Sequence, residues 1–218
     1  MPPIRLFSEI LSRLPGVVHG FSAPAADEAT HDPPCRRPRQ VHGTHLVEWH
    51  EVDSEPPEAD GVLCGAVGVR VGIVTADCVP VLLASRDGSR VAAVHAGWRG
   101  ISAGILEAAV DRLDSADWRA ALGPAAAGCC YRVGPEVLDA LRPAEERVTE
   151  HEPSGHARLD LRAVALDRLS ALAPAADRIE TVGPCTICSH EWPSYRRQGA
   201  EAERAVAWIG RTSLSLRR

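Results

Sequence analysis

The sequence predicts an α/β fold with α+β-like character: one layered domain in which mixed β-sheets are flanked by helices. Short apolar runs rich in β-branched residues recur along the chain, each bounded by Gly, Asp or Ser, which is typical of buried strands. These runs outnumber the segments with helical periodicity and often follow one another directly. Mixed sheets with helices packed outside therefore fit better than strict alternation of strand and helix.

The first part of the chain is expected to contain short strands between long loops. Residues 4–14 have an amphipathic spacing that suits either a short helix or a strand with a helical turn. Pro15-Gly16 ends that segment, and residues 22–39 are rich in Pro, Ala, Asp and Arg without periodicity. The further expected elements are a strand at 17–21, a loop at 22–39, a strand at 40–49, a loop at 53–57 and a strand at 62–64.

Three apolar runs, at 69–74, 79–84 and 91–94, form the centre of the predicted sheets. The clearest helix follows at 101–113, where apolar side chains recur at helical spacing. The remaining expected elements are a strand at 118–122, helices at 135–141 and 159–172, a polar surface segment at 143–156, and strands at 179–182 and 205–209. We find no internal repeat and no linker, and expect residues 1–218 to form a single domain.

The composition is that of a globular protein and excludes several classes of partner. The formal charge of −5 argues against a dedicated nucleic-acid binder. Residues 1–20 resemble neither a signal peptide nor a spanning helix, because charged side chains interrupt every apolar run. The seven cysteines show no disulfide-framework spacing. We expect a cytoplasmic protein with reduced thiols, no membrane or nucleic-acid partner, and a monomer or weak homodimer.

All 24 basic residues are arginine, so an anion site must use Arg, His or backbone N–H groups. Arg99, at the start of a predicted helix, is a candidate phosphate or ribose contact; a structural salt bridge is the alternative. Arg196 and Arg197 are candidates for a second phosphate contact, since a guanidinium group binds phosphate in a bidentate manner.

Three potential metal ligands, His42, Cys78 and His95, lie beside small or turn-forming residues near the predicted central strands. Two nitrogens and one sulfur with an open fourth position form the ligand set of a catalytic zinc ion. Cys78 and His95 also suit a nucleophile and its base. A buried cysteine with two hydrogen-bonded histidines is the structural alternative.

Other polar residues near these motifs have structural expectations. We expect Asp77 to cap its turn and Asp60 to hold a loop near the metal. Cys185 and Cys188 form a single C-x-x-C, which is weak evidence for zinc, so structural thiols near the site are expected. Cys129 and Cys130 are adjacent, and packing in the core is expected for them.

Several motifs in a fixed order, spread over residues 16–210, closely resemble those of the laccase-domain family. This family is also called multicopper polyphenol oxidoreductases, peptidoglycan editing factors or purine nucleoside phosphorylases. The motifs are Gln40-Val41-His42-Gly43, Ala59-Asp60-Gly61, Thr75-Ala76-Asp77-Cys78-Val79-Pro80, His95-Ala96-Gly97-Trp98-Arg99-Gly100, Gly123-Pro124, Cys129-Cys130-Tyr131, Cys185-Thr186 and Ser194-Tyr195-Arg196-Arg197.

The resemblance implies one Zn²⁺ ion held by His42, Cys78 and His95 in a layered α/β fold. It further implies phosphorolysis of adenosine, inosine, guanosine or methylthioadenosine, with adenosine deamination in some members. Cys78, His95 and Arg99 are then the catalytic candidates. Multicopper oxidation is set aside, because the motifs supply only two histidines for several coppers.

Two other functions remain open at the level of sequence. One is a Cys78/His95 hydrolase acting on an amide or on cell-wall precursors, in keeping with the peptidoglycan-editing name. The other is a degenerate member that binds a nucleotide or a partner protein without turnover. It is motivated by a short segment between Phe21 and Gln40, where only Arg36, Arg37 and Arg39 are candidates for a family arginine. The family's later Thr-Gly-Arg reads Ala202-Glu203-Arg204.

Overall fold

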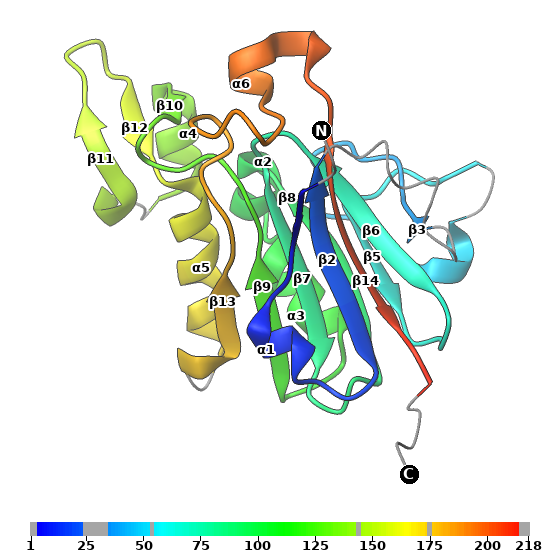
Figure 1. The fold of residues 1–218 in the computed structure, drawn as a ribbon. Helices are drawn as coiled ribbons and strands as arrows, with labels where there is room; N and C mark the ends of the chain where they lie inside the picture. The colour runs from blue at the N-terminus through cyan, green and yellow to red at the C-terminus, as the bar shows by residue number, and fades with distance from the viewer. Residues whose placement is uncertain (1–3, 24–34, 53–54, 143–144, 174–175, 214–218) are drawn as a thin grey trace.

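Two mixed β-sheets stacked face to face, with helices against the outer face of one of them, form the body of the molecule (Figure 1). The computed structural model describes residues 4–23, 35–52, 55–142, 145–173 and 176–213. Each of the two sheets contains both parallel and antiparallel pairs of strands, which makes both of them mixed sheets. The predicted fold class is confirmed.

The six-stranded sheet lies between the helices and the second sheet. Its order is β13-β9-β7-β8-β5-β4. Along β7, Val81 and Leu83 pack in the core shared with the helices, whereas Leu82 and Ala84 pack in the core shared with the other sheet. Both faces are therefore apolar, which explains the continuous hydrophobic runs in the sequence. The strands are β4 (Leu46–Glu48), β5 (Gly61–Cys64), β7 (Val79–Ser85), β8 (Val91–Ala96), β9 (Trp118–Leu122) and β13 (Ile179–Thr181).

The five-stranded sheet joins the two ends of the chain. Its order is β1-β2-β14-β6-β3, so the last strand lies between an early strand and a central one. Phe21, Ile73 and Ile209 contribute to its buried face. The strands are β1 (Ile4–Leu6), β2 (Val17–Ala23), β3 (Cys35–Arg36), β6 (Arg70–Thr75) and β14 (Ala205–Arg211).

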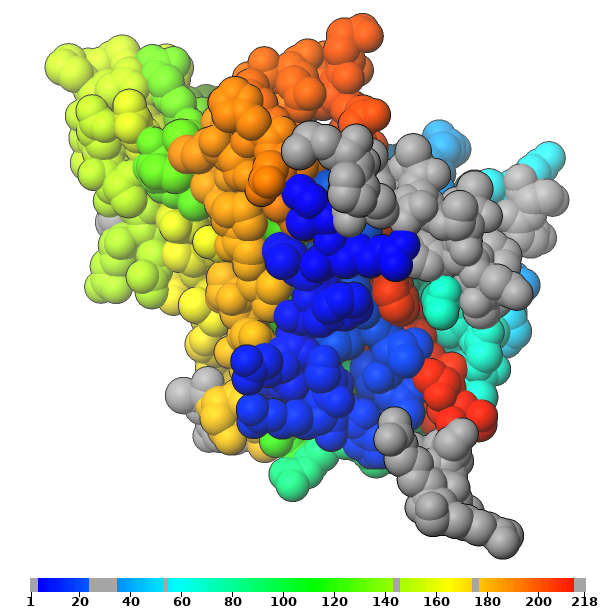
Figure 2. All heavy atoms as spheres, in the orientation of Figure 1, coloured from blue at the N-terminus to red at the C-terminus, as the bar shows by residue number. Residues whose placement is uncertain are grey.

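Helices cover the outer face of the six-stranded sheet, where α3 and α5 pack against each other (Figure 1). A small sheet of order β10-β12-β11 projects from one corner of the molecule (Figure 2). None of the helices in the described ranges has the length and apolarity that crossing a bilayer requires. The elements are α1 (Glu9–Ser12), α2 (Trp98–Ser102), α3 (Ile105–Arg112), α4 (Pro135–Ala140), α5 (Leu161–Leu172), α6 (Tyr195–Gln198), β10 (Arg132–Val133), β11 (Val148–His151), β12 (Ala157–Leu159), η2 (Trp49–Glu51), η3 (Glu145–Arg147), η4 (Ala176–Arg178) and η5 (Gly199–Glu201).

The central strands match their predictions to within a residue or two, and the differences elsewhere have local causes. Residues 4–14 form a strand followed by a helical turn. The single helix predicted at 101–113 is wrong: the chain breaks it into α2 and α3, because Gly104 adopts a left-handed φ of 91° before α3 begins. The surface segment at 143–156 contains β11, which pairs with β12.

The strand predicted at 40–49 is also wrong over its first half. Only Leu46–Glu48 pairs with a neighbour, whereas the backbone N–H groups of Val41, His42 and Gly43 donate to the carboxylate of Asp60. A loop that turns its N–H groups onto one side chain cannot also form a strand ladder. The predicted loop at 22–39 is shorter than expected, because β2 extends to Ala23 and β3 begins at Cys35. Residues 24–34 of that loop lie outside the described residues.

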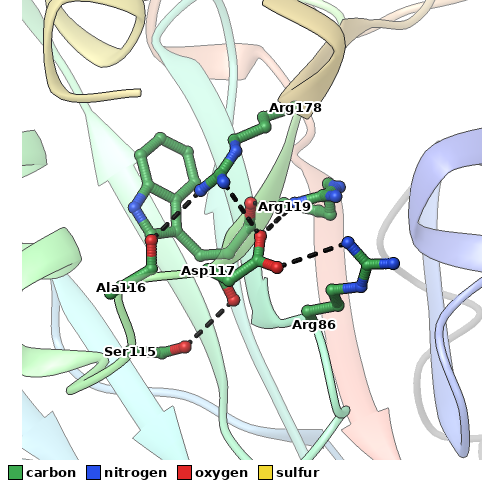
Figure 3. Close-up of polar contacts among 7 residues, drawn as sticks. Arg86, Ser115, Ala116, Asp117, Arg119 and Arg178 are labelled. Atoms are coloured by element: carbon green, nitrogen blue, oxygen red, sulfur yellow. Dashed lines mark hydrogen bonds and ion pairs between the residues drawn. The ribbon is translucent and has the colours of Figure 1, made fainter. Parts of the chain in front are cut away.

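Asp117 fixes the start of β9 to two neighbouring segments (Figure 3). Its carboxylate lies 2.6 Å from Arg119, 3.2 Å from Arg178 and 3.4 Å from Arg86. Arg178 also donates to the carbonyl of Ala116 at 3.1 Å. This network holds the end of the six-stranded sheet where β9 begins.

Candidate functional site

His42, Cys78 and His95 come together at one end of the central strands. Cys78 immediately precedes β7 and His95 lies near the end of β8, and these strands pair so that Pro80 lies opposite His95. The ligand atoms of the three residues lie within 4.8 Å of one another. The two imidazole rings meet edge to face, with centroids 4.8 Å apart. The predicted ligand set is therefore assembled by sheet pairing and one loop.

Asp60 orients two of these three residues. It is fully buried, and its Oδ1 lies 2.7 Å from Nδ1 of His95. The same carboxylate accepts backbone N–H groups of His42 at 2.9 Å and Gly43 at 2.6 Å. A carboxylate on one imidazole nitrogen directs the other nitrogen toward a metal, which is the usual outer partner of a zinc-bound histidine. The loop-holding role expected for Asp60 is confirmed.

Gly97 leaves the space that these ligands occupy. A Cβ atom at this position would lie 3.1 Å from Cδ2 of His42 and 3.2 Å from Sγ of Cys78. His42 itself adopts a left-handed φ of 61°. The close approach of three ligands thus depends on a residue without a side chain and on a strained loop residue.

The electrostatics of the group favour a thiolate. Burial raises the pKa of Cys78, but hydrogen bonds with His42 and His95 outweigh it and lower that pKa to about 6. Burial lowers the pKa of His95, yet the Asp60 carboxylate and the Cys78 sulfur raise it to about 9. Because thiolate and imidazole are both zinc ligands, and three protein ligands leave one position open, the donor set fits a catalytic zinc ion.

A cavity of about 750 Å³ opens beside the three ligands, and four arginines and several aromatic residues help to line it. This volume is in the range of small-molecule sites, about 300–1,000 Å³. The positively charged side chains contrast with the net charge of −5 of the whole chain. The principal polar and aromatic lining residues are Arg39, Gln40, Trp98, Arg99, Tyr131, Tyr195, Arg196 and Arg204.

Arg99 and Arg196 both line the cavity, and the phosphate contacts expected of them stay predictions. The Arg99 guanidinium stacks on Trp98 at 4.3 Å and forms no ion pair within the described residues, so the salt-bridge alternative is not realised there. Arg196 stacks on Tyr131 at 4.8 Å and donates to the carbonyl of Arg132 at 2.5 Å. The Arg99 guanidinium therefore lines the cavity without an ion-pair partner among the described residues.

Arg197 does not line the cavity. Its guanidinium donates to four backbone carbonyls within and just after the C-x-x-C, namely those of Thr186, Ile187, Ser189 and Trp192. With its donors committed to the backbone, Arg197 holds this segment in place. A phosphate contact by Arg197 would require it to give up some of these hydrogen bonds.

Asp77 connects three segments rather than capping its own turn. It has a left-handed φ of 89°, and its carboxylate accepts hydrogen bonds from Oγ1 of Thr186 and Oγ of Ser194. It also accepts the backbone N–H of Arg196 at 2.7 Å. Asp77 thereby attaches the turn that carries Cys78 to the wall of the cavity.

Sequence reasoning missed Gln40, Tyr131 and Arg204 as lining residues. The Gln40 amide forms two 2.8 Å hydrogen bonds with the backbone of Val74, as a neighbouring strand would. Each of the three lies within or next to a sequence motif that resembles the family's. Their position in these motifs is the sequence feature that could have identified them as lining residues. Among the candidates for the family arginine, Arg39 lines this cavity, whereas Arg36 donates to the carbonyl of Val52.

The expectation that Cys129 and Cys130 pack in the core is wrong. Cys129 is exposed and Cys130 is half-buried, and both lie beside the C-x-x-C pair formed by Cys185 and Cys188. The four thiols form a second group, separate from the three ligands at the cavity.

Comparison with known proteins gives a consistent result. The family model described as multi-copper polyphenol oxidoreductase laccase matches residues 22–212. A protein of Aquifex aeolicus named purine nucleoside phosphorylase is 36% identical over 163 residues, covering 73% of this chain and 75% of the relative. A Pseudomonas aeruginosa protein with the same name is 38% identical over 181 residues, covering 78% and 72%. A protein of an unknown prokaryotic organism named adenosine deaminase RL5 is 33% identical, covering 80% and 74%.

Solved structures have the same fold. The crystal structure of YlmD from Geobacillus stearothermophilus superposes with a TM-score of 0.80 at 26% identity, covering 94% of each chain. Protein NMB0706 of Neisseria meningitidis superposes with a TM-score of 0.77 at 32% identity, covering 83% of this chain and 76% of the other.

Proposed function

This chain belongs to the multi-copper polyphenol oxidoreductase laccase family, and on that basis we propose that it is a zinc-dependent purine nucleoside phosphorylase. The names of several relatives support phosphorolysis of purine nucleosides, and the name of another supports adenosine deamination as an accompanying activity. The substrates are adenosine, inosine, guanosine or methylthioadenosine, together with phosphate.

One observation carries this proposal: the ligand atoms of His42, Cys78 and His95 converge within 4.8 Å beside an arginine-lined cavity. Phosphorolysis requires a bound anion next to a sugar whose bond to the base breaks as positive charge develops on the sugar. The cavity combines a site for a cation with side chains that bind an anion. Copper oxidation finds no comparable support, since the described residues bring only two histidines to this group.

The residues that line the cavity have different roles in this reaction. Arg99 and Arg196 bind phosphate, and Trp98 and Tyr195 offer aromatic surfaces to the base. Burial raises the pKa of Tyr131 to about 12, so its hydroxyl keeps its proton and donates a hydrogen bond to substrate. Zinc held by His42, Cys78 and His95 would supply a Lewis acid and lower the pKa of water for deamination.

The test is chromatography of adenosine incubated with the zinc-loaded protein, with and without phosphate. Free adenine and ribose 1-phosphate, formed only with phosphate, are the expected products. Inosine alone would replace the proposal with a deaminase. No product from any of the four nucleosides would reject it in favour of a hydrolase or a non-catalytic binder. The variant Cys78→Ala supplies the inactive control, and Cys64→Ala the matched substitution of a buried cysteine outside both thiol groups.

The lowered pKa of Cys78 beside two histidines favours a second candidate, a Cys78/His95 hydrolase. Alkylation separates the two. A zinc-bound thiolate resists iodoacetamide until a chelator is added, whereas a free nucleophile of pKa about 6 reacts at once. Mass spectrometry of the Cys78 peptide measures the rate in both conditions.

A further inference from the structure

Four cysteines from two distant segments gather outside the cavity site. Cys129 and Cys130 lie in the turn before β10, and Cys185 and Cys188 lie in the turn after β13. Their four Sγ atoms all lie within 4.8 Å of one another, with Cys129 and Cys188 3.2 Å apart. In Figure 2, the surface of the segment after β13, drawn in orange, lies beside the projecting small sheet.

The distances suit a tetrahedral ion with four sulfur ligands. A zinc–sulfur bond of about 2.3 Å gives sulfur–sulfur separations of about 3.8 Å in a tetrahedron. The Cys129–Cys188 distance of 3.2 Å is shorter than this value, and no two of the four sulfurs lie more than 4.8 Å apart. A single disulfide would use only two of the four sulfurs, whereas a tetrahedral ion uses all four.

The two segments are also held together by backbone contacts. Ala125 and Cys185 form a parallel bridge, and the N–H of Thr186 donates to the carbonyl of Ala125 at 3.1 Å. Arg197 donates to the carbonyls of Thr186 and Ile187. On the other side, Arg158 donates to the carbonyl of Cys129 at 2.9 Å. The two loops that carry the four sulfurs are therefore fixed by these hydrogen bonds.

We propose that Cys129, Cys130, Cys185 and Cys188 bind a second zinc ion, in a closed structural site distinct from the three-ligand site at the cavity. Four protein ligands leave no open position, so this ion stabilises structure and does not bind substrate. The sulfurs of exposed Cys129 and Cys188 give the ion a path from solvent.

Asp77 connects this second site to the cavity through hydrogen bonds. The N–H of Ala126 donates to the carbonyl of Asp77 at 2.8 Å, and Oγ1 of Thr186 donates to its carboxylate at 2.7 Å. Both segments that the second zinc ion joins are thus attached to the residue before Cys78. The ion would hold the wall that carries Tyr131 and Arg196 against the turn that carries a ligand of the first ion.

Elemental analysis of the purified, zinc-supplemented chain tests the proposal directly. Two zinc ions per chain are expected in the wild type and in Cys35→Ser, which changes a cysteine outside both groups. Cys129→Ser and Cys188→Ser should each contain one. Cys78→Ala should also contain one, and X-ray absorption of that variant should show only sulfur around the remaining zinc.

The wild-type protein keeps the proposal falsifiable even where a variant fails to fold. One zinc ion per chain, with Cys129, Cys130, Cys185 and Cys188 all alkylated under native conditions, would overturn the second site. A disulfide among the four in peptide mass spectra, or nitrogen ligands around the zinc retained by Cys78→Ala, would overturn it as well. None of these outcomes depends on phosphorolysis.

Discussion

The carboxylate of Asp60 lies 2.7 Å from Nδ1 of His95, in a position from which solvent is excluded. The same group accepts the backbone N–H groups of the loop that carries His42. These hydrogen bonds hold the pKa of Asp60 below its usual value although burial acts to raise it. One carboxylate thus sets the orientation of two ligands that are far apart in the sequence.

Replacing Asp60 with Asn should weaken zinc binding at the cavity by about tenfold to hundredfold, as loss of an outer carboxylate does in other zinc sites. The amide has the same shape but carries no charge to stabilise the imidazole. Competition with a chromophoric chelator measures the affinity. Asp87→Asn is the matched control, because Asp87 also accepts hydrogen bonds in a turn but lies in neither metal group. Equal affinities in the two variants would contradict the role of Asp60.

Removal of the Cys78 sulfur should abolish zinc binding at the cavity and catalysis together. Cys78→Ala takes away the single sulfur ligand of that group and leaves only the two imidazoles. Zinc content and phosphorolysis measured on the same preparation check this, with Cys64→Ala for comparison. A variant that keeps both its zinc at His42 and His95 and its full rate would disprove the assignment.

Arg99→Ala should raise the KM for phosphate about tenfold to hundredfold, because a hydrogen bond to a charged group contributes about 1.5–3 kcal/mol. Its zinc content should not change, since Arg99 is not a ligand. Initial rates at varied phosphate concentration provide the measurement. Arg13→Ala, which removes an exposed arginine at the C-cap of α1, serves as the matched control. If both variants show the wild-type phosphate dependence, Arg99 is structural.

The buried His19 should make the fold less stable in acid. Burial holds its pKa below 6.5, and its Nε2 accepts the N–H of Ser8 at 2.8 Å, which requires the unprotonated ring. The unfolded chain therefore binds the proton more readily, so the free energy of unfolding falls as pH drops below about 6.5. Urea unfolding between pH 7.5 and about 5 should show a shallower decline for His19→Gln than for the wild type. Exposed His190→Gln should retain the wild-type slope.

Local sequence pattern was sufficient for the central strands and for the identity of the candidate ligands. The strand Val79–Ser85 is buried on both faces, because the second sheet covers one face and the helices cover the other. Such a strand needs apolar residues at successive positions, and this continuous apolar run can be recognised in the sequence. Asp160 caps α5 in the same local way, since its side chain accepts the N–H of Ala163 only three residues away. Such features depend on neighbours along the chain.

Only the tertiary structure decided the contacts between distant segments. The loop carrying His42 is not a strand, because a carboxylate 18 residues away takes its N–H groups. Arg197 donates to backbone carbonyls and does not line the cavity. The sulfur of Cys129 contacts that of Cys188, which is 59 residues away in the sequence. Side-chain hydrogen bonds and thiol groups of this kind carry no periodic signal. They exist only once the sheets have brought their segments together, so the sequence determined the elements and ligand types while the fold determined which groups share a site.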